Sequence, residues 1–213
     1  LGRLAGKKYY PTGAATAAEE ISIVYSDETG RLERITDPRG TTRFAYDRGD
    51  RVAEIAAPEG TVRYEYDPVS GLRTRTSTDN SDFRFAYDEL GRLLTVQVVK
   101  RDGVELPAPE TYAYTYTPSG RRASLTQPSG VRTVYAYDQL NRLSLMQHVA
   151  TNGAVLASFA YQHAANNLRT SLVEVTYGPS GTYRTNVINY AYDALDRLVL
   201  EKGTDLADNS TYQ

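Results

Sequence analysis

The stretch YDELGRL, Tyr87–Leu93, decides the fold because the same order of residue types returns along the chain. It recurs as YDQLNRL from Tyr137 and as YDALDRL from Tyr192, and YDRGDRV from Tyr46 is a variant. In each copy an aspartate follows the tyrosine, and a Gly, Asn or Asp stands three residues later. Aspartate favours the start of a type I turn, and these residues tolerate the left-handed conformation that closes it. The stretch therefore predicts a hairpin corner, after which Arg-Leu begins the returning strand.

Tyrosines that precede such corners mark a repeat of about 21 residues, lengthened in places by insertions. These anchor positions are Tyr25, Tyr46, Tyr66, Tyr87, Tyr116, Tyr137, Tyr161 and Tyr192. Most anchors end an alternation of two aromatic residues around one small residue, as in Phe44/Tyr46 and Tyr135/Tyr137. Side chains two residues apart on a strand share one face. The repeat therefore predicts strands that present aromatic rings on a common face.

A second turn signal falls half a repeat later. Proline in the second position and glycine in the fourth occur in DPRG from Asp37, APEG from Ala57, QPSG from Gln127 and GPSG from Gly178. This pattern is typical of a type I turn. Two turns per repeat predict two short strands per repeat, and the tight connections require antiparallel neighbours. Insertions from Val98 and from His148 are expected to lengthen this second turn.

Strict alternation fails just after Arg-Leu, as in RLERIT, where Leu32 and Ile35 are three residues apart. This spacing predicts a β-bulge on the returning strand. Equivalent rings of successive repeats lie two strands apart, about 9.6 Å, so the Leu or Val of each returning strand falls between them. We expect an alternating Tyr/Leu ladder whose hydroxyls suit the wall of a cavity, on about 15 strands spanning about 70 Å.

Composition limits the classes of function. The 213 residues suit one domain with a core. Lys and Arg total 24 against 26 acids, so no positive field exists to attract nucleic acid or anionic lipid. The absence of cysteine excludes disulfides and thiolate metal sites. No run approaches 18 apolar residues and LGRLAGKKYY has no hydrophobic signal region, so neither a membrane span nor an export signal is expected.

Eight anchors in register make the chain resemble the YD-repeat or RHS-repeat family. That family includes Rhs proteins, the B and C components of bacterial insecticidal toxin complexes, wall-associated YD-repeat proteins and the teneurin ectodomain. The resemblance runs from LGRL at Leu1, which looks like the tail of a truncated repeat, to YDALDRL at Tyr192. YTPSGRR from Tyr116 and YQHAANNL from Tyr161 depart from the pattern.

This resemblance implies an all-β fold in which an antiparallel sheet of repeated hairpins spirals into a hollow shell, often around a C-terminal toxin polypeptide. We expect residues 1–213 to form a single YD-repeat segment of about eight repeats, interrupted within a repeat at both ends. The segment would then be an incomplete part of a larger shell.

The residues singled out by the repeat are expected to be structural. They are Tyr46, Asp47, Tyr66, Asp67, Tyr87, Asp88, Gly91, Arg92, Tyr137, Asp138, Arg142, Tyr192, Asp193 and Arg197. Their aspartates are expected to cap turns and not to bind calcium, because no oxygen-rich ligand run follows them. TDNSD from Thr78 also lacks the glycine and distal glutamate of a calcium loop. No metal, cofactor or catalytic residue is predicted.

Other candidate groups also have structural interpretations. His148 and His163 are expected to be loop or edge histidines. The arginines of the corners are expected to pair across strands with acids on a solvated face, the alternative being a basic stripe for acidic glycans. They are Arg51, Arg92, Arg142 and Arg197. DPVSGL from Asp67 resembles a scrap of the family's self-cleavage motif, but it lies in an ordinary repeat position, so the activity is not carried over.

The favoured hypothesis is a non-catalytic structural segment of a large secreted or surface protein of bacteria, which forms part of a shell and whose partners are the flanking repeats and an encapsulated toxin polypeptide. The alternative is a carbohydrate-binding or cell-surface adhesion module that uses exposed tyrosines such as Tyr112, Tyr114 and Tyr135. An enzyme is the most distant hypothesis, because no Ser/His/Asp set, phosphate loop or dinucleotide fingerprint occurs. No nucleic-acid partner is expected.

Overall fold

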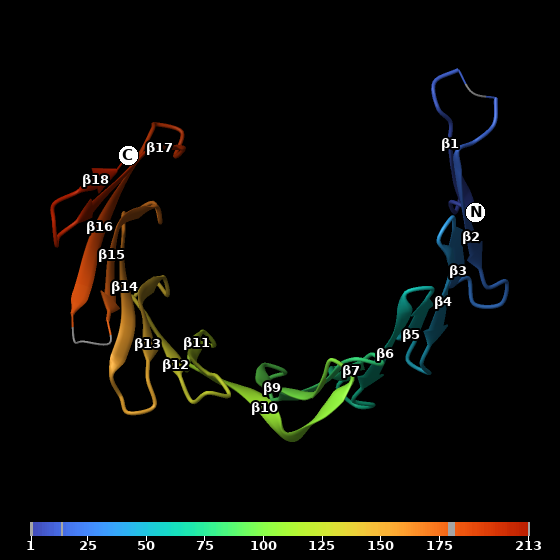
Figure 1. Ribbon diagram of the computed structural model, residues 1–213, viewed down its shortest axis with the longest axis horizontal. Helices are drawn as coiled ribbons and strands as arrows, with labels where there is room; N and C mark the ends of the chain where they lie inside the picture. The colour runs from blue at the N-terminus through green and yellow to red at the C-terminus, as the bar shows by residue number, and fades with distance from the viewer. Residues whose placement is uncertain (1, 14, 179–181, 213) are drawn as a thin grey trace. The chain divides into compact units, whose positions relative to one another are not determined.

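Hairpin-linked strands make up the regular structure in this computed structural model, which describes residues 2–13, 15–178 and 182–212 (Figure 1). The described residues contain 18 strands and no helix, and all strands belong to one antiparallel sheet. Within the part of the chain that the structure describes, the strands of each compact unit pair with their neighbours in sequence. The predicted all-β fold, an antiparallel sheet of repeated hairpins, is therefore confirmed.

The chain divides into two compact units, Leu1–Glu110 and Thr111–Gln213, and each is described by itself. The first contains β1 (Gly6–Tyr9), β2 (Glu19–Tyr25), β3 (Leu32–Asp37), β4 (Gly40–Tyr46), β5 (Val52–Ala57), β6 (Gly60–Tyr66), β7 (Arg73–Ser77), β8 (Asp82–Tyr87) and β9 (Leu93–Arg101). Strand β10 (Val104–Tyr116) begins in the first unit and ends in the second. The second also contains β11 (Arg122–Thr126), β12 (Arg132–Tyr137), β13 (Leu143–Val149), β14 (Val155–His163), β15 (Arg169–Tyr177), β16 (Tyr183–Tyr192), β17 (Leu198–Asp205) and β18 (Thr211–Tyr212).

The strand number exceeds the expected 15 because eight corners give 16 strands, β2 to β17, and two further strands flank them. Strands β1 and β18 form where the sequence repeat is absent, and each pairs with its neighbour over four and two positions. The insertion from Val98 is also not a longer loop, because it continues β9 and β10 up to a tight turn at Asp102 and Gly103, both with positive φ. Part of the GPSG turn signal, residues 179–181, lies outside the described residues.

The predicted bulges are present on the returning strand of every corner. Tyr46 pairs with Val52 while Ala45 pairs with Glu54, so Ala53 is the extra residue. The extra residues of the eight corners are Glu33, Ala53, Thr74, Leu94, Ala123, Ser144, Thr170 and Val199. Val52 and Ile55, the partners of Tyr46 and Phe44, are three residues apart. Because the bulge takes up one residue, both partners still lie on the same face of the sheet.

Cross-strand pairs define two faces of the sheet in the first unit. Phe44 pairs with Ile55 and Tyr46 pairs with Val52, so these side chains share what we call the aromatic face. The other face carries charges: Arg63 binds Glu54 at 3.1 Å, and Arg75 binds Glu65 at 2.8 Å and Asp82 at 2.9 Å. This face therefore has the cross-strand ion pairs of a solvated sheet surface.

In the second unit the face opposite the aromatic one is largely uncharged. A cross-strand row runs from Leu145 through Ala160 and Val173 to Val187. The same row in the first unit is occupied by Glu and Arg. The two units thus share a repeat and an aromatic face but differ in the chemistry of the opposite face.

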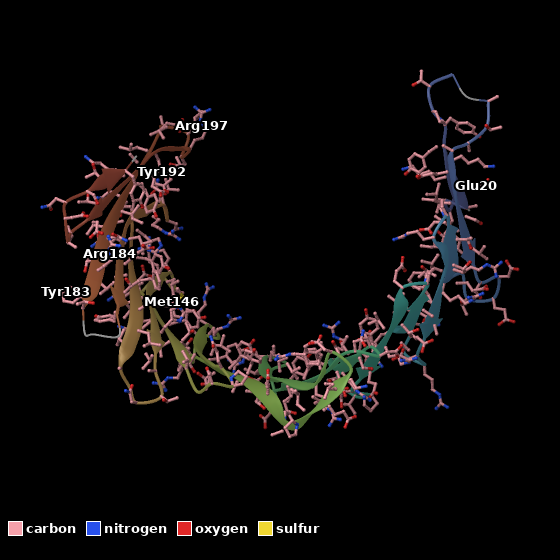
Figure 2. All side chains as sticks on the ribbon, viewed as in Figure 1. Glu20, Met146, Tyr183, Arg184, Tyr192 and Arg197 are labelled. Carbon is pink, nitrogen blue, oxygen red and sulfur yellow. The ribbon has the colours of Figure 1, made fainter. Side chains whose placement is uncertain are left out.

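Few side chains of this single-layer sheet are buried. Among the described residues the buried apolar side chains are Val98, Leu172 and Ile188. The accessible surface is 14291 Å², against about 9,800 Å² for a compact monomer of this mass. Side chains project from both sides of the strands without a covering layer from the same unit (Figure 2). Half-buried aromatic rings therefore take the place of a central core.

Candidate functional site at the hairpin corners

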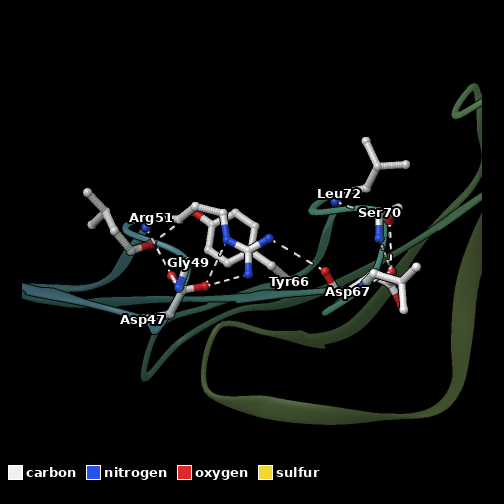
Figure 3. A network of polar contacts seen from close by, with 9 residues as sticks. Asp47, Gly49, Arg51, Tyr66, Asp67, Ser70 and Leu72 are labelled. Carbon is white, nitrogen blue, oxygen red and sulfur yellow. Dashed lines mark hydrogen bonds and ion pairs between the residues drawn. The ribbon is translucent and has the colours of Figure 1, made fainter.

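The second hairpin corner, residues 46–52, shows how one repeat is held to the next (Figure 3). Asp47 accepts the backbone N–H groups of Gly49 at 2.8 Å and Arg51 at 2.9 Å through Oδ1. Its Oδ2 accepts the Arg51 guanidinium at 2.8 Å. One carboxylate thus closes the turn and fixes the arginine, because its two oxygens have separate tasks.

The Arg51 side chain then reaches into the third corner. Its guanidinium lies 4.5 Å from the centre of the Tyr66 ring, and Nη1 donates to the Asp67 carbonyl at 3.5 Å. The Tyr66 hydroxyl in turn donates to the Val52 carbonyl at 2.9 Å. An arginine of one repeat and a tyrosine of the next therefore hold adjacent corners together by a cation–π contact and two backbone contacts.

The capping geometry is common to four corners. In each the aspartate accepts two backbone N–H groups and the Nε of the arginine four residues later; the pairs are Asp47/Arg51, Asp88/Arg92, Asp138/Arg142 and Asp193/Arg197. Tyr192 and Arg197 lie at the last of these corners (Figure 2). In Asp67, by contrast, Oδ1 accepts from Val69 and Ser70, because this turn is one residue longer than the other four. Leu72 also stands where the other four corners have arginine, so no guanidinium reaches Oδ2.

The residue before each corner arginine, or its replacement, has the left-handed conformation predicted from turn chemistry. Asp50, Asn141 and Asp196 have φ of 67°, 59° and 60°, and Gly91 has φ of 74°. These residue types adopt this region at low cost. The Tyr, Asp, Gly and Arg residues singled out in the sequence are thus brought together corner by corner, and not into one site.

The prediction that the corner arginines pair with acids across the strands is wrong. Arg51, Arg92, Arg142 and Arg197 bind the aspartate of their own turn, four residues away, and not an acid across the sheet. The register explains the difference: each arginine lies between the left-handed turn residue and the first pair of the ladder, so the turn carboxylate is nearest. A stripe of unpaired positive charge is therefore not formed by these four residues.

Hydrogen bonding lowers the pKa of the corner aspartates below the ordinary value. At Asp47 the Arg51 guanidinium is the largest cause, followed by the Arg51 backbone N–H. At Asp138 and Asp193 the backbone N–H of the corner arginine contributes most. At Asp88 burial opposes ionisation, but hydrogen bonds from Arg92 outweigh it and the pKa is lowered. The corners therefore favour the ionised carboxylate.

The hydroxyls of the anchor tyrosines bind the backbone of the preceding repeat. Anchor hydroxyls donate to a backbone carbonyl of the preceding repeat at 2.8–2.9 Å, in the pairs Tyr46/Leu32, Tyr66/Val52, Tyr87/Arg73, Tyr137/Arg122 and Tyr192/Arg169. Val52 lies beyond the last β5–β6 ladder pair, at Glu54 and Arg63. The hydroxyl therefore supplies a hydrogen bond between repeats beyond the point where the ladder hydrogen bonds end.

Three arginines interrupt the expected Tyr/Leu ladder. Arg73 lies between the rings of Tyr64 and Phe85, at 5.7 and 5.3 Å from their centres. Equivalent contacts join Arg122 to Tyr114 and Tyr135, and Arg169 to Tyr161 and Tyr190. Each arginine pairs with its anchor at the position that Leu32 or Val52 occupies elsewhere. Aligning the repeats on the residue after the corner would have revealed this substitution.

These contacts bear on the tyrosines considered for sugar binding. Arg122 lies 5.2 Å from the Tyr114 ring centre and 5.9 Å from that of Tyr135. A guanidinium thus occupies one side of both rings, where a sugar would stack. The most exposed aromatic pair is elsewhere, at Tyr177 and Tyr183, whose ring centres are 6.3 Å apart.

The seventh corner is anchored by a histidine. His163 pairs with Arg169 just before the bulge, as Tyr46 pairs with Val52, so Tyr161 is the aromatic residue two positions earlier. The assignment of Tyr161 as the anchor was wrong because only its ring, and not the register, was visible in the sequence. His148 is also not in a loop: it lies on β13, bonds Thr133 Oγ1 at 3.0 Å and meets the Phe159 ring edge-on.

No group of three or more His, Cys, Asp or Glu side chains suited to a metal ion occurs in the described part of the chain. Within residues 2–13, 15–178 and 182–212 there is also no helix with the length and apolarity to cross a membrane.

Comparisons with known proteins agree with this geometry. Residues 27–62 match the family model of the RHS Repeat. The crystal structure of TcdB2-TccC3-TEV is similar with a TM-score of 0.64 at 15% identity, over 93% of this chain and 13% of that one. The crystal structure of TcdB2-TccC3-Cdc42 gives a TM-score of 0.49 at 12% identity, over 86% of this chain and 13% of that one. No curated protein matches the chain.

The resemblance to the YD-repeat or RHS-repeat family is confirmed by the family match over residues 27–62, and the fold is confirmed by the first of these structures. The family match covers the second corner, which includes Asp47, Gly49 and Arg51 of the network in Figure 3. The chain has the RHS-repeat fold of the first of these structures and spans about an eighth of its length, 13%. At 15% identity this likeness establishes the fold.

Proposed function

We propose that the chain is a non-catalytic structural segment of a larger secreted or surface RHS-repeat protein, in which its sheet forms part of a shell around a toxin polypeptide. The observation that carries the proposal is the uncovered aromatic face. Phe44, Tyr46 and Ile55 share a face that no layer of the same unit covers. A sheet with one apolar face ordinarily packs it against another layer.

The chemistry of the corners supports a structural role. Their carboxylates and guanidiniums bind each other and the backbone, as Asp47 and Arg51 do. A catalytic acid or base needs a proton that can reach a substrate, whereas these groups serve as turn caps and links between repeats. The likeness to TcdB2-TccC3-TEV over 93% of this chain supports a shell composed of more repeats than the chain contains.

The test is the structure and protease sensitivity of a full-length protein that contains this chain. Electron microscopy is expected to show a closed shell with this sheet in its wall. A polypeptide enclosed by that shell is expected to resist protease until the shell is opened by denaturant. An open particle, or cleavage of the polypeptide at the same rate in both states, would contradict the proposal.

A glycan array distinguishes the adhesion alternative. Binding that is lost in Tyr112→Ala or Tyr183→Ala variants would favour a carbohydrate-binding role over the shell. Tyr183 is chosen for substitution because it belongs to the exposed aromatic pair and 66% of its surface is accessible. The shell proposal expects no selective binding to the array.

A further inference from the structure

The third corner, residues 66–73, has a vacant position in an arrangement that the second corner fills. The second corner directs Arg51 toward three groups: Asp47 Oδ2, the Tyr66 ring and the Asp67 carbonyl. The corresponding groups one repeat later are Asp67 Oδ2, the Tyr87 ring and the Asp88 carbonyl. All three are present, but the residue that corresponds to Arg51 is Leu72.

Leu72 follows the path of an arginine stem without supplying its head group. A Cβ placed on Gly71 would lie 3.1 Å from Arg51 Nη1, and a Cβ placed on Gly91 would lie 3.6 Å from Leu72 Cδ1. Both side chains therefore cross the left-handed residue of the next corner. Leucine ends there, so the groups that would receive a guanidinium are left without one.

Two of the receiving groups are unused in the described part of the chain. The third, the Asp88 carbonyl, accepts the turn bond from Gly91 N–H at 2.9 Å and has a second lone pair for another donor. The Asp67 carboxylate accepts its turn bonds from Val69 and Ser70 through Oδ1, so Oδ2 has no hydrogen-bond partner among the described residues. Among the described side chains no cation lies over the Tyr87 ring, whereas Arg31 lies 5.2 Å from the centre of the Tyr46 ring. Glu89 adds a second carboxylate without a partner at the edge of this groove.

The space is large enough for a side-chain head group. A cavity of about 280 Å³ lies between the third and fourth corners, lined by Asp67, Leu72, Phe85, Tyr87 and Glu89, among others. The equivalent cavity between the first and second corners has the Arg31 side chain in its wall. A carboxylate, an aromatic ring and a carbonyl in this arrangement suit a planar cation that donates hydrogen bonds.

We propose that the groove between the third and fourth corners binds a guanidinium group supplied by an arginine side chain of another polypeptide. The inference does not depend on the proposed shell, because every group that it uses lies within residues 66–91. The seventh corner provides an internal comparison: Leu168 also replaces arginine there, but Ala164 replaces the aspartate, so the carboxylate is missing.

The test is a titration of the full 213-residue chain with N-acetyl-arginine amide, followed by NMR of leucine methyl and tyrosine ring signals. Saturable shifts are expected at Leu72 and Tyr87 and not at Leu168. N-acetyl-norleucine amide, which has an apolar stem and no guanidinium, is expected to cause no saturable shift. Absence of saturable shifts at Leu72 and Tyr87 with the arginine probe would overturn the proposal.

Three variants make the assignment specific. Asp67→Asn keeps a turn-forming side chain but removes the charge, so binding should weaken about tenfold or more. Leu72→Arg should supply the guanidinium within the chain and abolish binding of the probe. Arg51→Leu should open an equivalent groove at Asp47 and Tyr66 and add a second binding site. Unchanged affinity in Asp67→Asn would overturn the proposal even if neither of the other variants folded.

Discussion

A tyrosine hydroxyl provides a test of how repeats are joined at the scale of single residues. The Tyr66 hydroxyl donates to the Val52 carbonyl at 2.9 Å, beyond the end of the β5–β6 ladder. We expect Tyr66→Phe to lower the free energy of unfolding by about 1 kcal/mol, the net value of such a bond. Urea denaturation of the isolated chain measures this change.

Tyr64→Phe is the matched control for that variant. Tyr64 lies on the same strand and face, and its ring contacts Arg73, but no hydroxyl bond joins it to the preceding repeat in the described residues. Its loss of stability should be clearly smaller. Equal losses in the two variants would show that the hydroxyl bond does not hold the corners together.

The corner carboxylates predict a dependence of stability on pH. The pKa of Asp47 is lowered from 3.8, so the unfolded chain takes up the proton at a higher pH than the folded chain. The stabilisation is present above the ordinary value and is lost as pH falls through 3.8 and the lower folded pKa. We expect the denaturation midpoint to be nearly constant from about pH 7 to 5 and to fall below about pH 4.

Asp47→Asn isolates this effect at one corner. The variant should be less stable than the original chain near pH 7, and the difference should shrink on acidification because a protonated Asp47 loses its advantage over asparagine. A difference that is the same at pH 7 and pH 3 would contradict the role assigned to the ionised carboxylate. The comparison cancels the contributions of the other acidic residues.

At the scale of elements, each corner requires a left-handed residue. Gly91 has φ of 74°, and an added Cβ would meet Leu72 Cδ1 only at an ordinary 3.6 Å. The cost of Gly91→Ala therefore comes from the backbone, about 1 kcal/mol. Gly91→Asn should cost less, because Asn141 adopts φ of 59° at the equivalent position. Equal destabilisation by alanine and asparagine, measured by urea denaturation, would contradict this account.

Turns, strand faces and bulges could be predicted from the sequence because they depend on residues near each other in the chain. The carboxylate of Asp88 and the left-handed Gly91 act within one turn, and the three-residue spacing of Leu32 and Ile35 reports a bulge directly. The insertion after Val98 was harder, since its alternation fits either a loop with turn signals or two longer strands.

Contacts between repeats could not be predicted, because they depend on the exact register. The hydroxyl acceptor of Tyr66 is a backbone carbonyl, which carries no sequence signature. Whether Arg51 pairs with its own turn or across the sheet depends on a position only one residue before the ladder. His163 occupies the anchor position because it pairs with Arg169, whereas the sequence pattern had indicated Tyr161.

At the scale of the whole molecule, protection of the backbone should vary along the sheet. Leu172 and Ile188 are buried on β15 and β16, whereas β1 has only exposed residues and β18 pairs at two positions. Local opening requires less energy where few apolar groups are buried. Hydrogen exchange should therefore be slowest in β15 and β16 and fastest in β1 and β18. Uniform protection factors over all four strands would contradict this expectation.

Pairing only between chain neighbours has a mechanical consequence. If the two ends of the chain are pulled apart, each hairpin can open without disturbing hairpins further along, because the described strands of each unit pair with their neighbours in sequence. The hairpins should therefore open one after another, at low force and in successive events. A released repeat of about 21 residues adds about 70 Å of contour length, so an optical trap should record a ladder of such extensions and not one abrupt event.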